Sequence, residues 1–277
     1  MKSICTFVLS RASLAALFLS GAGMAAAQEP PAPVAAPSAR DGQQGAPAAS
    51  AVIRLTLEDA GAAYIDVARG LESDGHGVPA MLALMSGEGS SYIPFAPPFL
   101  RDGDMIVSHT AAILLYLGGR IGLAPTEEDG RLWTHQIQLT ITDIVKEVYN
   151  SHHPIDEDKW FHEQKDEALA RAAVFRRDRM PKFLGWFERI LEANPAAGVQ
   201  LVGVSVTYAD LSLFQLVEGL RFAFPLASER ELAKLPRVTA LHKAMAERPR
   251  LKAYLASERR VSFKETGIFR RYPELDG

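Results

Sequence analysis

From residue 51 onward, the spacing of apolar and polar residues predicts short helices and strands that alternate along the chain. The run AVIRLTLEDAG ends at Gly61, and glycine commonly follows the last turn of a helix. The run AYIDVAR alternates between two faces, as a short strand does. Two further runs joined through Asp102-Gly103 predict a β-hairpin. The predicted order is helix 51–61, strand 63–69, helix 79–87, hairpin 97–109 and helix 110–119.

The second half of the sequence has helical spacing and no convincing strand pattern. Residues 132–149 place apolar side chains on one helical stripe. Residues 166–193 form a longer pattern that contains Pro181, which should kink or break the helix. Residues 208–224 are apolar on several faces, so we expect a buried central helix there. A last helix is predicted from Pro236 to about Ala256.

The first 27 residues have the pattern of a secretory signal peptide. Lys2 and Arg11 precede the apolar run 12–19, and small residues follow up to Ala27. The run is shorter than the roughly 20 residues that a membrane-spanning helix needs. We therefore expect cleavage after Ala27 and a periplasmic or secreted protein. The alternative is an internal translation start or a frameshift upstream of the domain, which would leave the protein cytoplasmic.

Residues 28–50 are rich in Pro, Ala, Gly and Gln, which predicts a flexible linker. The single cysteine, Cys5, lies in the predicted signal, so a mature chain would have no disulfide and no thiolate metal site. Loss of Lys2 and Arg11 would change the net charge from −3 to −5. This charge, without a long basic run, argues against nucleic acid as a partner.

The segment from Phe95 to Leu123 carries the most specific chemistry. Prolines precede the predicted hairpin, and His109-Thr110 lies between its second strand and the next helix. Helix N-termini attract anions, and a hydroxyl there can donate to a carboxylate, so this corner could bind a carboxylate group. The alternative is that Thr110 only caps its own helix.

This segment resembles the glutathione transferase family, and the resemblance extends over roughly residues 51–277. Pro98 matches the cis-proline before the third strand of the thioredoxin-like domain, and Thr110 matches the serine or threonine after the fourth. The implied fold is an α/β thioredoxin-like domain over 51–123, atypical or incomplete at its N-terminus. An all-α C-terminal domain over 128–262 and a tail over 263–277 would follow it.

The resemblance implies roles for five residues in binding glutathione, which would be a co-substrate rather than a resident cofactor. His109 and Thr110 would hold the γ-glutamyl carboxylate, and Pro97 and Pro98 the cysteinyl part. Asp143 would reach the glutamyl amine across a homodimer; the alternative is an ordinary solvated helix charge. His109 replaces the usual glutamine or glutamate. Pro97 has no N–H, so one of two backbone hydrogen bonds to glutathione is lost, at a cost of about 1 kcal/mol.

Three other features have structural interpretations. Thr207-x-x-Asp210 fits a capping box at the start of the central helix. His152-His153-Pro154 lacks metal-ligand spacing, and we expect these histidines to point apart in a loop that leaves the helix. The tail could fold back over an electrophile pocket or pack on the surface.

The first strand and the catalytic loop of the family are not recognisable directly before residue 51. In the family, a tyrosine or serine hydroxyl there stabilises the glutathione thiolate. Ser38 and Ser50 are the only hydroxyls between the signal and the first helix, and neither has the expected strand-loop setting. The catalytic residue therefore stays unassigned.

Three functions remain open from the sequence. The first is a homodimeric transferase that joins glutathione to small electrophiles. The second is an exported, catalytically weak protein that binds glutathione or another ligand. The third is a structural scaffold built on the helical domain.

Overall fold

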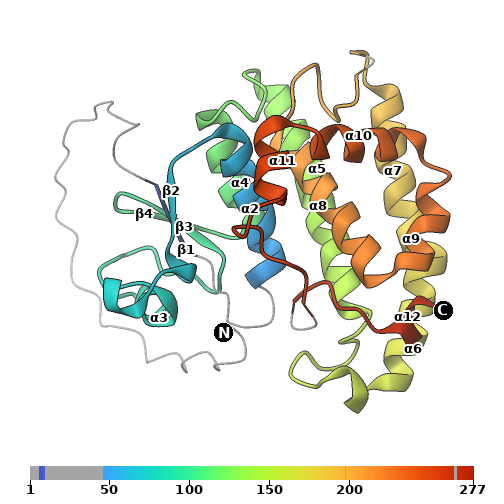
Figure 1. Cartoon of the computed structure of the whole chain (residues 1–277), viewed down its shortest axis with the longest axis horizontal. Coiled ribbons are helices and arrows are strands. Elements are labelled where there is room, and N and C mark those ends of the chain that lie inside the picture. The colour runs from blue at the N-terminus through green and yellow to red at the C-terminus, as the bar shows by residue number, and fades with distance from the viewer. Residues whose placement is uncertain (1–5, 10–45, 197, 265–266) are drawn as a thin grey trace, which may run out of the picture.

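The computed structural model describes residues 6–9, 46–196, 198–264 and 267–277. A small sheet with three helices around it forms one side of the molecule, and a larger group of helices forms the other (Figure 1). The sheet side contains β1 (Thr6–Leu9), α2 (Ala46–Ala60), β2 (Tyr64–Asp66), α3 (Gly77–Met85), β3 (Phe99–Asp102), β4 (Met105–Ser108) and α4 (Thr110–Arg120). The helical side contains α5 (Glu128–Asn150), α6 (Lys165–Val174), α7 (Met180–Ala193), α8 (Tyr208–Ala223), α9 (Pro225–Leu232), α10 (Pro236–Ala246), α11 (Pro249–Leu255) and α12 (Pro273–Asp276).

The sheet has the strand order β2-β1-β3-β4, so β1 is an inner strand. It pairs antiparallel with β2, with Phe7 opposite Asp66, and parallel with β3, with Phe7 opposite Leu100. The expectation that the domain lacks a recognisable first strand is therefore wrong. The strand comes from the segment predicted as a signal peptide, because a short apolar run fits both roles. Cleavage after Ala27 would remove β1 from the sheet.

The other predicted elements of the sheet side are present with shifted ends. Helix α2 begins at Ala46, inside the predicted linker, and β2 is only three residues long before a 3₁₀ turn follows. The hairpin β3–β4 turns at Gly103, which has a φ of 61° and therefore favours glycine. The ends of these helices and strands are set by strand pairing and packing in the folded protein, because local propensity alone does not define them.

Pro181 interrupts the long helical pattern as expected. A π-helical turn over Phe175–Arg179 separates α6 from α7, and Pro181 lies in the first turn of α7. The backbone stays helical through this turn, in which the N–H of Met180 donates to the carbonyl of Phe175 five residues back. The wider turn accommodates Pro181, which has no N–H to donate. The predicted last helix is likewise two helices, α10 and α11, because Pro249 starts a new helix.

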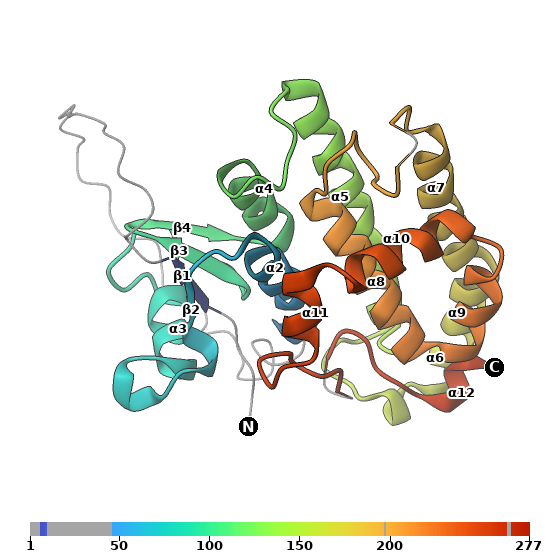
Figure 2. The same ribbon diagram turned by 45° about the horizontal axis from the view of Figure 1, so that its top comes forward.

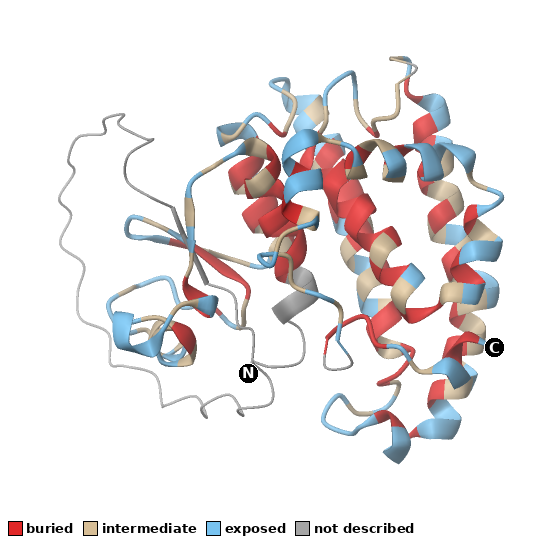
Figure 3. Ribbon diagram, viewed as in Figure 1, coloured by how far each residue is buried: buried red, intermediate tan, exposed pale blue. Residues whose placement is uncertain are grey.

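Helix α8 is the centre of the helical side, as predicted from its apolar faces. Nearly all of its residues are buried, and it contacts α2, α5, α9 and α10 (Figure 3). Its N-terminus is fixed by Asp210, whose carboxylate is fully buried. That carboxylate accepts from the N–H of Leu201 at 2.7 Å and from the N–H and hydroxyl of Thr207 at 2.7 and 2.8 Å. Burial raises the pKa of Asp210 to about 6, although these hydrogen bonds act in the opposite direction.

The two sides are joined by a polar clamp between α2 and the segment around α11, which lie side by side (Figure 2). Arg248 binds both carboxylate oxygens of Asp59 at 2.6 and 2.7 Å, and this carboxylate is almost fully buried. Arg250 donates to the carbonyl groups of Asp59 and Ala60 at the end of α2. A bidentate pair of this kind fixes orientation as well as distance, so the position of α2 is tied to the helical side.

Replacing Asp210 with alanine should lower the free energy of unfolding by about 3 kcal/mol or more, because three buried donors lose their acceptor. Urea denaturation followed by circular dichroism measures this loss. Glu247→Ala, which removes an exposed ion pair with Lys252, is the matched control and should change stability by less than about 0.5 kcal/mol. Equal effects of the two substitutions would contradict the role of Asp210.

Candidate functional site

The candidate site is built around the bend that leads into β3. The peptide bond between Pro97 and Pro98 is cis, as the resemblance implies. Pro98 is buried, Pro97 is half-buried, and Phe99 and Leu100 continue as buried residues of β3. The hairpin then returns the chain through β4 to the start of α4, so the bend and the helix start belong to neighbouring parts of one unit.

His109 occupies the junction between β4 and α4 with an unusual backbone conformation. Its φ is 71° and its ψ 125°, and it is the one non-glycine residue with positive φ in the described part of the chain. Such a conformation is disfavoured for a residue with a Cβ and is often found at functional sites. The exposed imidazole accepts a hydrogen bond from the N–H of Ala111 through Nδ1 at 3.3 Å.

His109 is therefore the N-cap of α4, and Thr110 is its first residue. The alternative, in which Thr110 is the N-cap of its own helix, is therefore wrong, because His109 is the N-cap. Thr110 is half-buried at the helix start, where backbone N–H groups and the positive end of the helix dipole favour an anion. This placement keeps the carboxylate-binding interpretation of the corner open.

Helix α4 is held against the hairpin by a side-chain contact. The hydroxyl of Tyr116 donates to the carboxylate of Asp102 at 2.7 Å, and the Arg120 guanidinium lies 3.7 Å from the centre of the Tyr116 ring. Burial, followed by the hydrogen bond to Asp102, raises the pKa of Tyr116. On its inner face α4 buries Ile113, Leu114 and Leu117 completely. The helix start is thus positioned from both faces of α4.

His135 on α5 is a residue near this corner that sequence reasoning missed. Burial lowers the pKa of its imidazole, and the neighbouring His109 lowers it further. Its Nδ1 is buried without a hydrogen-bond partner in the described part of the chain. No local pattern points to this residue, because only the packing of α5 beside α4 brings it close to His109.

Asp143 lies on the exposed side of α5. In the described part of the chain it forms no hydrogen bond or ion pair with Pro97, Pro98, His109 or Thr110. The structure thus brings the two prolines and the His109-Thr110 pair into one unit, and leaves Asp143 facing outward.

Of the two candidate hydroxyls, Ser50 is buried in α2, and its oxygen accepts from Arg54 at 3.2 Å. Arg54 also binds Asp66 of β2 at 2.8 Å, so Ser50 belongs to a buried polar contact between α2 and the sheet. Ser38 lies outside the described residues, as does the rest of the chain between β1 and α2. The described residues therefore assign no catalytic hydroxyl.

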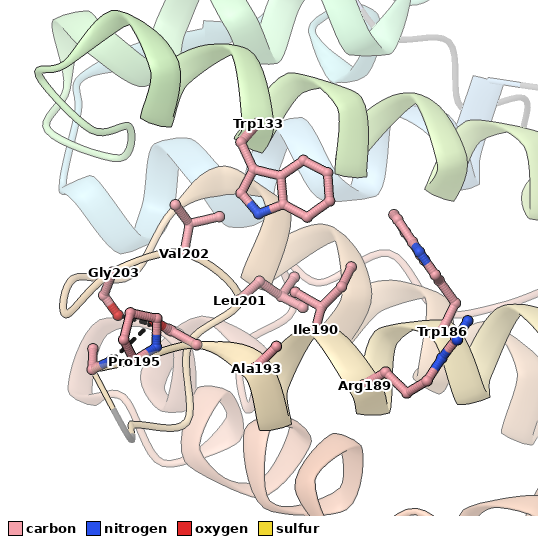
Figure 4. Close-up of a pocket in the computed structure, with 11 residues that line it drawn as sticks. Trp133, Trp186, Arg189, Ile190, Ala193, Pro195, Leu201, Val202 and Gly203 are labelled. Carbon is pink, nitrogen blue, oxygen red and sulfur yellow. Dashed lines mark hydrogen bonds between the residues drawn. The ribbon is translucent and has the colours of Figure 1, made fainter.

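A hollow of about 510 Å³ lies on the helical side (Figure 4). Trp133 of α5 and Trp186 of α7 line it, with their rings edge to face at 6.2 Å, together with Ile190 and the loop up to Gly203. None of the five residues predicted to bind glutathione is among its lining residues.

His152 and His153 lie where the chain leaves α5, as predicted, but the prediction that they point apart is wrong. Both are buried, and their Nδ1 atoms lie 2.7 Å apart. Within the described residues, no group of three or more His, Cys, Asp and Glu side chains is arranged to hold a metal ion. No helix among those residues has the length and apolar character needed to cross a membrane.

Comparison with known proteins identifies the helical side. Residues 149–258 match the family model described as "Glutathione S-transferase, C-terminal domain". A glutathione S-transferase of Plasmodium falciparum is 24% identical over 213 residues, which cover 75% of this chain and 90% of that protein. Glutathione S-transferase P 1 of Xenopus laevis is 26% identical over 167 residues, covering 59% of this chain and 69% of that protein.

Solved structures show that the fold is shared over about three quarters of this chain. The Pi-class glutathione S-transferase of Onchocerca volvulus superposes with a TM-score of 0.53 at 22% identity, over 75% of this chain and 86% of that one. The glutathione S-transferase Blo t 8 has a TM-score of 0.60 at 22% identity, over 76% and 89% of the two chains. The family model over residues 149–258, the curated relatives and the shared fold all indicate the glutathione S-transferase family.

Proposed function

We propose that this protein is a glutathione transferase that joins the thiol of glutathione to electrophilic small molecules. In this reaction the thiol loses its proton, the thiolate sulfur forms a bond to an electrophilic carbon, and a leaving group departs or a double bond is saturated. The observation that carries the proposal is the bend at Pro97-Pro98 followed by His109-Thr110 at the start of α4. The relatives named glutathione S-transferase support the same function.

The geometry of the corner suits a short peptide that carries a carboxylate on its γ-glutamyl residue. In this proposal an extended peptide lies beside the bend that leads into β3, and the start of α4 provides a favourable potential for the γ-glutamyl carboxylate. In this proposal the Thr110 hydroxyl donates to that carboxylate. His109 is the N-cap and accepts from the N–H of Ala111, the residue after Thr110.

Pro97 sets a limit on affinity. Its carbonyl can accept from the cysteinyl N–H of glutathione, but it has no N–H to donate in return. The loss of one such bond costs about 1 kcal/mol, which corresponds to a several-fold weaker complex. The proposal therefore predicts a transferase with reduced affinity for glutathione rather than one without a binding site.

The exported binding protein is the alternative function, and nothing in the comparisons favours it. Export would require removal of residues 1–27. However, β1 lies in that segment and pairs with both β2 and β3. An intact sheet and cleavage after Ala27 exclude each other. We therefore propose a protein that is not exported and keeps these residues as a native part of its sheet, which also differs from the alternative of a frameshift upstream of the domain.

We also propose that the protein is a homodimer. Phe95, next to the bend, is 95% exposed, and Ile93 beside it is 64% exposed. Soluble monomers seldom present such large apolar side chains together. A two-fold dimer would cover them with a second copy of this chain. The hollow between Trp133 and Trp186 offers an apolar, aromatic surface for that copy (Figure 4), and Asp143 would reach the glutathione of the other subunit.

Thr110→Val should weaken glutathione binding about tenfold or more, because a donor to the carboxylate is lost while the shape of the side chain is kept. Retention on immobilised glutathione and calorimetric titration measure the binding. Turnover of a chromogenic electrophile measures conjugation.

The control for this substitution is Thr126→Val, since Thr126 is an exposed residue before α5. It should bind glutathione as the unmodified protein does. Binding without turnover in the unmodified protein would favour the ligand-binding alternative. A protein that does not bind glutathione would leave only the scaffold function.

Phe95→Ser should weaken the dimer about a thousandfold. In a two-fold dimer the substitution removes one ring from each subunit, and burial of each ring contributes about 2 kcal/mol to association. Light scattering after size-exclusion chromatography over a dilution series measures the change. Leu226→Ser, which alters an exposed leucine on α9, is the control and should leave the mass unchanged. A monomeric unmodified protein would contradict the homodimer.

A further inference from the structure

The last residues of the chain, 267–277, form a C-terminal strap along the helical side. The strap follows α11 and ends in α12 beside α6 and α9 (Figures 1 and 2). Phe269 is buried against Gly219 of α8, where an added Cβ would lie 2.5 Å from its ring. Asp276 accepts from the N–H groups of Leu226 and Ala227 at 2.7 and 3.0 Å, and thereby caps α9.

The strap is joined to the end of α5 by a buried chain of hydrogen bonds. Nη1 of Arg270 lies 3.1 Å from Nε2 of His153, and Nδ1 of His153 lies 2.7 Å from Nδ1 of His152. Nε2 of His152 then lies 2.9 Å from the carbonyl oxygen of Ile268. Both histidines and Arg270 are at most 3% exposed.

This chain of bonds has one consistent arrangement of protons. Arginine only donates, so Nε2 of His153 must accept. A neutral His153 then carries its proton on Nδ1 and donates to Nδ1 of His152. His152 therefore carries its proton on Nε2 and donates to Ile268. A second proton on either ring would place two N–H groups against each other, so the contact requires both histidines to be neutral.

The surroundings also oppose a positive charge on the pair. Arg270 of the strap and Lys146 of α5 are the cations that face it, and Lys146 is paired with exposed Glu157. Tyr149 of α5 stacks on His153 at 4.7 Å, and Tyr272 of the strap lies 6.0 Å from His152. Trp160 lies over the Arg270 guanidinium at 5.5 Å. Among the described residues, no carboxylate hydrogen-bonds to either histidine or to Arg270.

From this cluster we infer that the C-terminal strap is an acid-released closure: it stays docked while His152 and His153 are neutral, and protonation of the pair releases it. Release would separate Arg270 and Ile268 from α5, uncover the apolar face of α8 under Phe269, and remove the Asp276 cap from α9. The inference concerns the strap alone and does not depend on the proposed transferase function.

The direction of the pH effect follows from the pKa values of the two histidines in the docked and the released states. Burial, then Arg270 and Lys146, lower the pKa of His153 to about 4 in the docked state. Burial, then His153 and Arg270, lower the pKa of His152 well below its usual value. In water a histidine has a pKa of about 6.5. Between about pH 6.5 and 4 the released state therefore binds more protons, and its population relative to the docked state rises about tenfold per pH unit for each histidine.

Hydrogen exchange of the full chain, measured by mass spectrometry from pH 7 to pH 5, tests the release. Exchange rates are divided by the intrinsic chemical rate at each pH. Below about pH 6.5, protection of the strap and of the N–H groups of Leu226 and Ala227 should fall about tenfold or more per pH unit. Protection in α7 should stay constant. No change in the strap, or loss of protection throughout the protein at the same pH, would overturn the inference.

Two variants and one further measurement separate this effect from general acid sensitivity. His153→Gln keeps an acceptor for Arg270 and has no titratable proton, so the pH dependence of strap protection should fall to about half, because only His152 still titrates. His242→Gln, at a histidine of α10 that is bound to Glu218, should behave as the unmodified protein. If His153→Gln does not fold, nuclear magnetic resonance of the unmodified protein should show both imidazoles neutral until the strap is released. Charged imidazoles in the docked state, or equal pH dependence in both variants, would disprove the inference.

Discussion

The position of α8 depends on one buried carboxylate, and most of the molecule depends on α8. Asp210 satisfies donors from Leu201 and Thr207, and so fixes where the central helix begins. Helices α2, α5, α9 and α10 pack on that helix, and the strap is seated on it at Gly219. A charge buried in this way is tolerated because each of its bonds replaces one to water. The candidate site is affected too, since α2 and α4 are placed against the helical side through the same core.

The candidate site and the strap depend on different physical interactions. At the start of α4, a disfavoured backbone conformation at His109 is maintained by the helix that follows it and by the Tyr116–Asp102 contact. That arrangement orients backbone N–H groups toward an anion. At the end of α5, two neutral histidines connect the strap to the helix, and their neutrality is enforced by burial and by nearby cations. The start of α4 is therefore suited to binding an anion, while the histidine pair at the end of α5 is sensitive to protonation.

Much of the fold and part of the site could be predicted from local patterns. The hairpin around Asp102-Gly103, the helix after His109 and the buried helix 208–224 follow from turn chemistry and periodicity, which act over a few residues. The break at Pro181 follows from the missing N–H of proline. The cis bond at Pro98 was expected from the resemblance. By contrast, the first strand was assigned wrongly, because Thr6–Leu9 has the composition of a leader and acquires its role only by pairing with β2 and β3.

The sequence by itself determined the order of the later elements, the capping residues of α8 and the proline-hairpin-helix corner that indicates glutathione binding. Each of these depends on residues within about one turn of helix or one hairpin, so the information is local. Only the tertiary structure decided that β1 is an inner strand, that His135 approaches His109, and that His152 and His153 connect to Arg270. The residues in these contacts are separated by up to 117 positions, and no short-range pattern relates them; packing of the finished core brings them together.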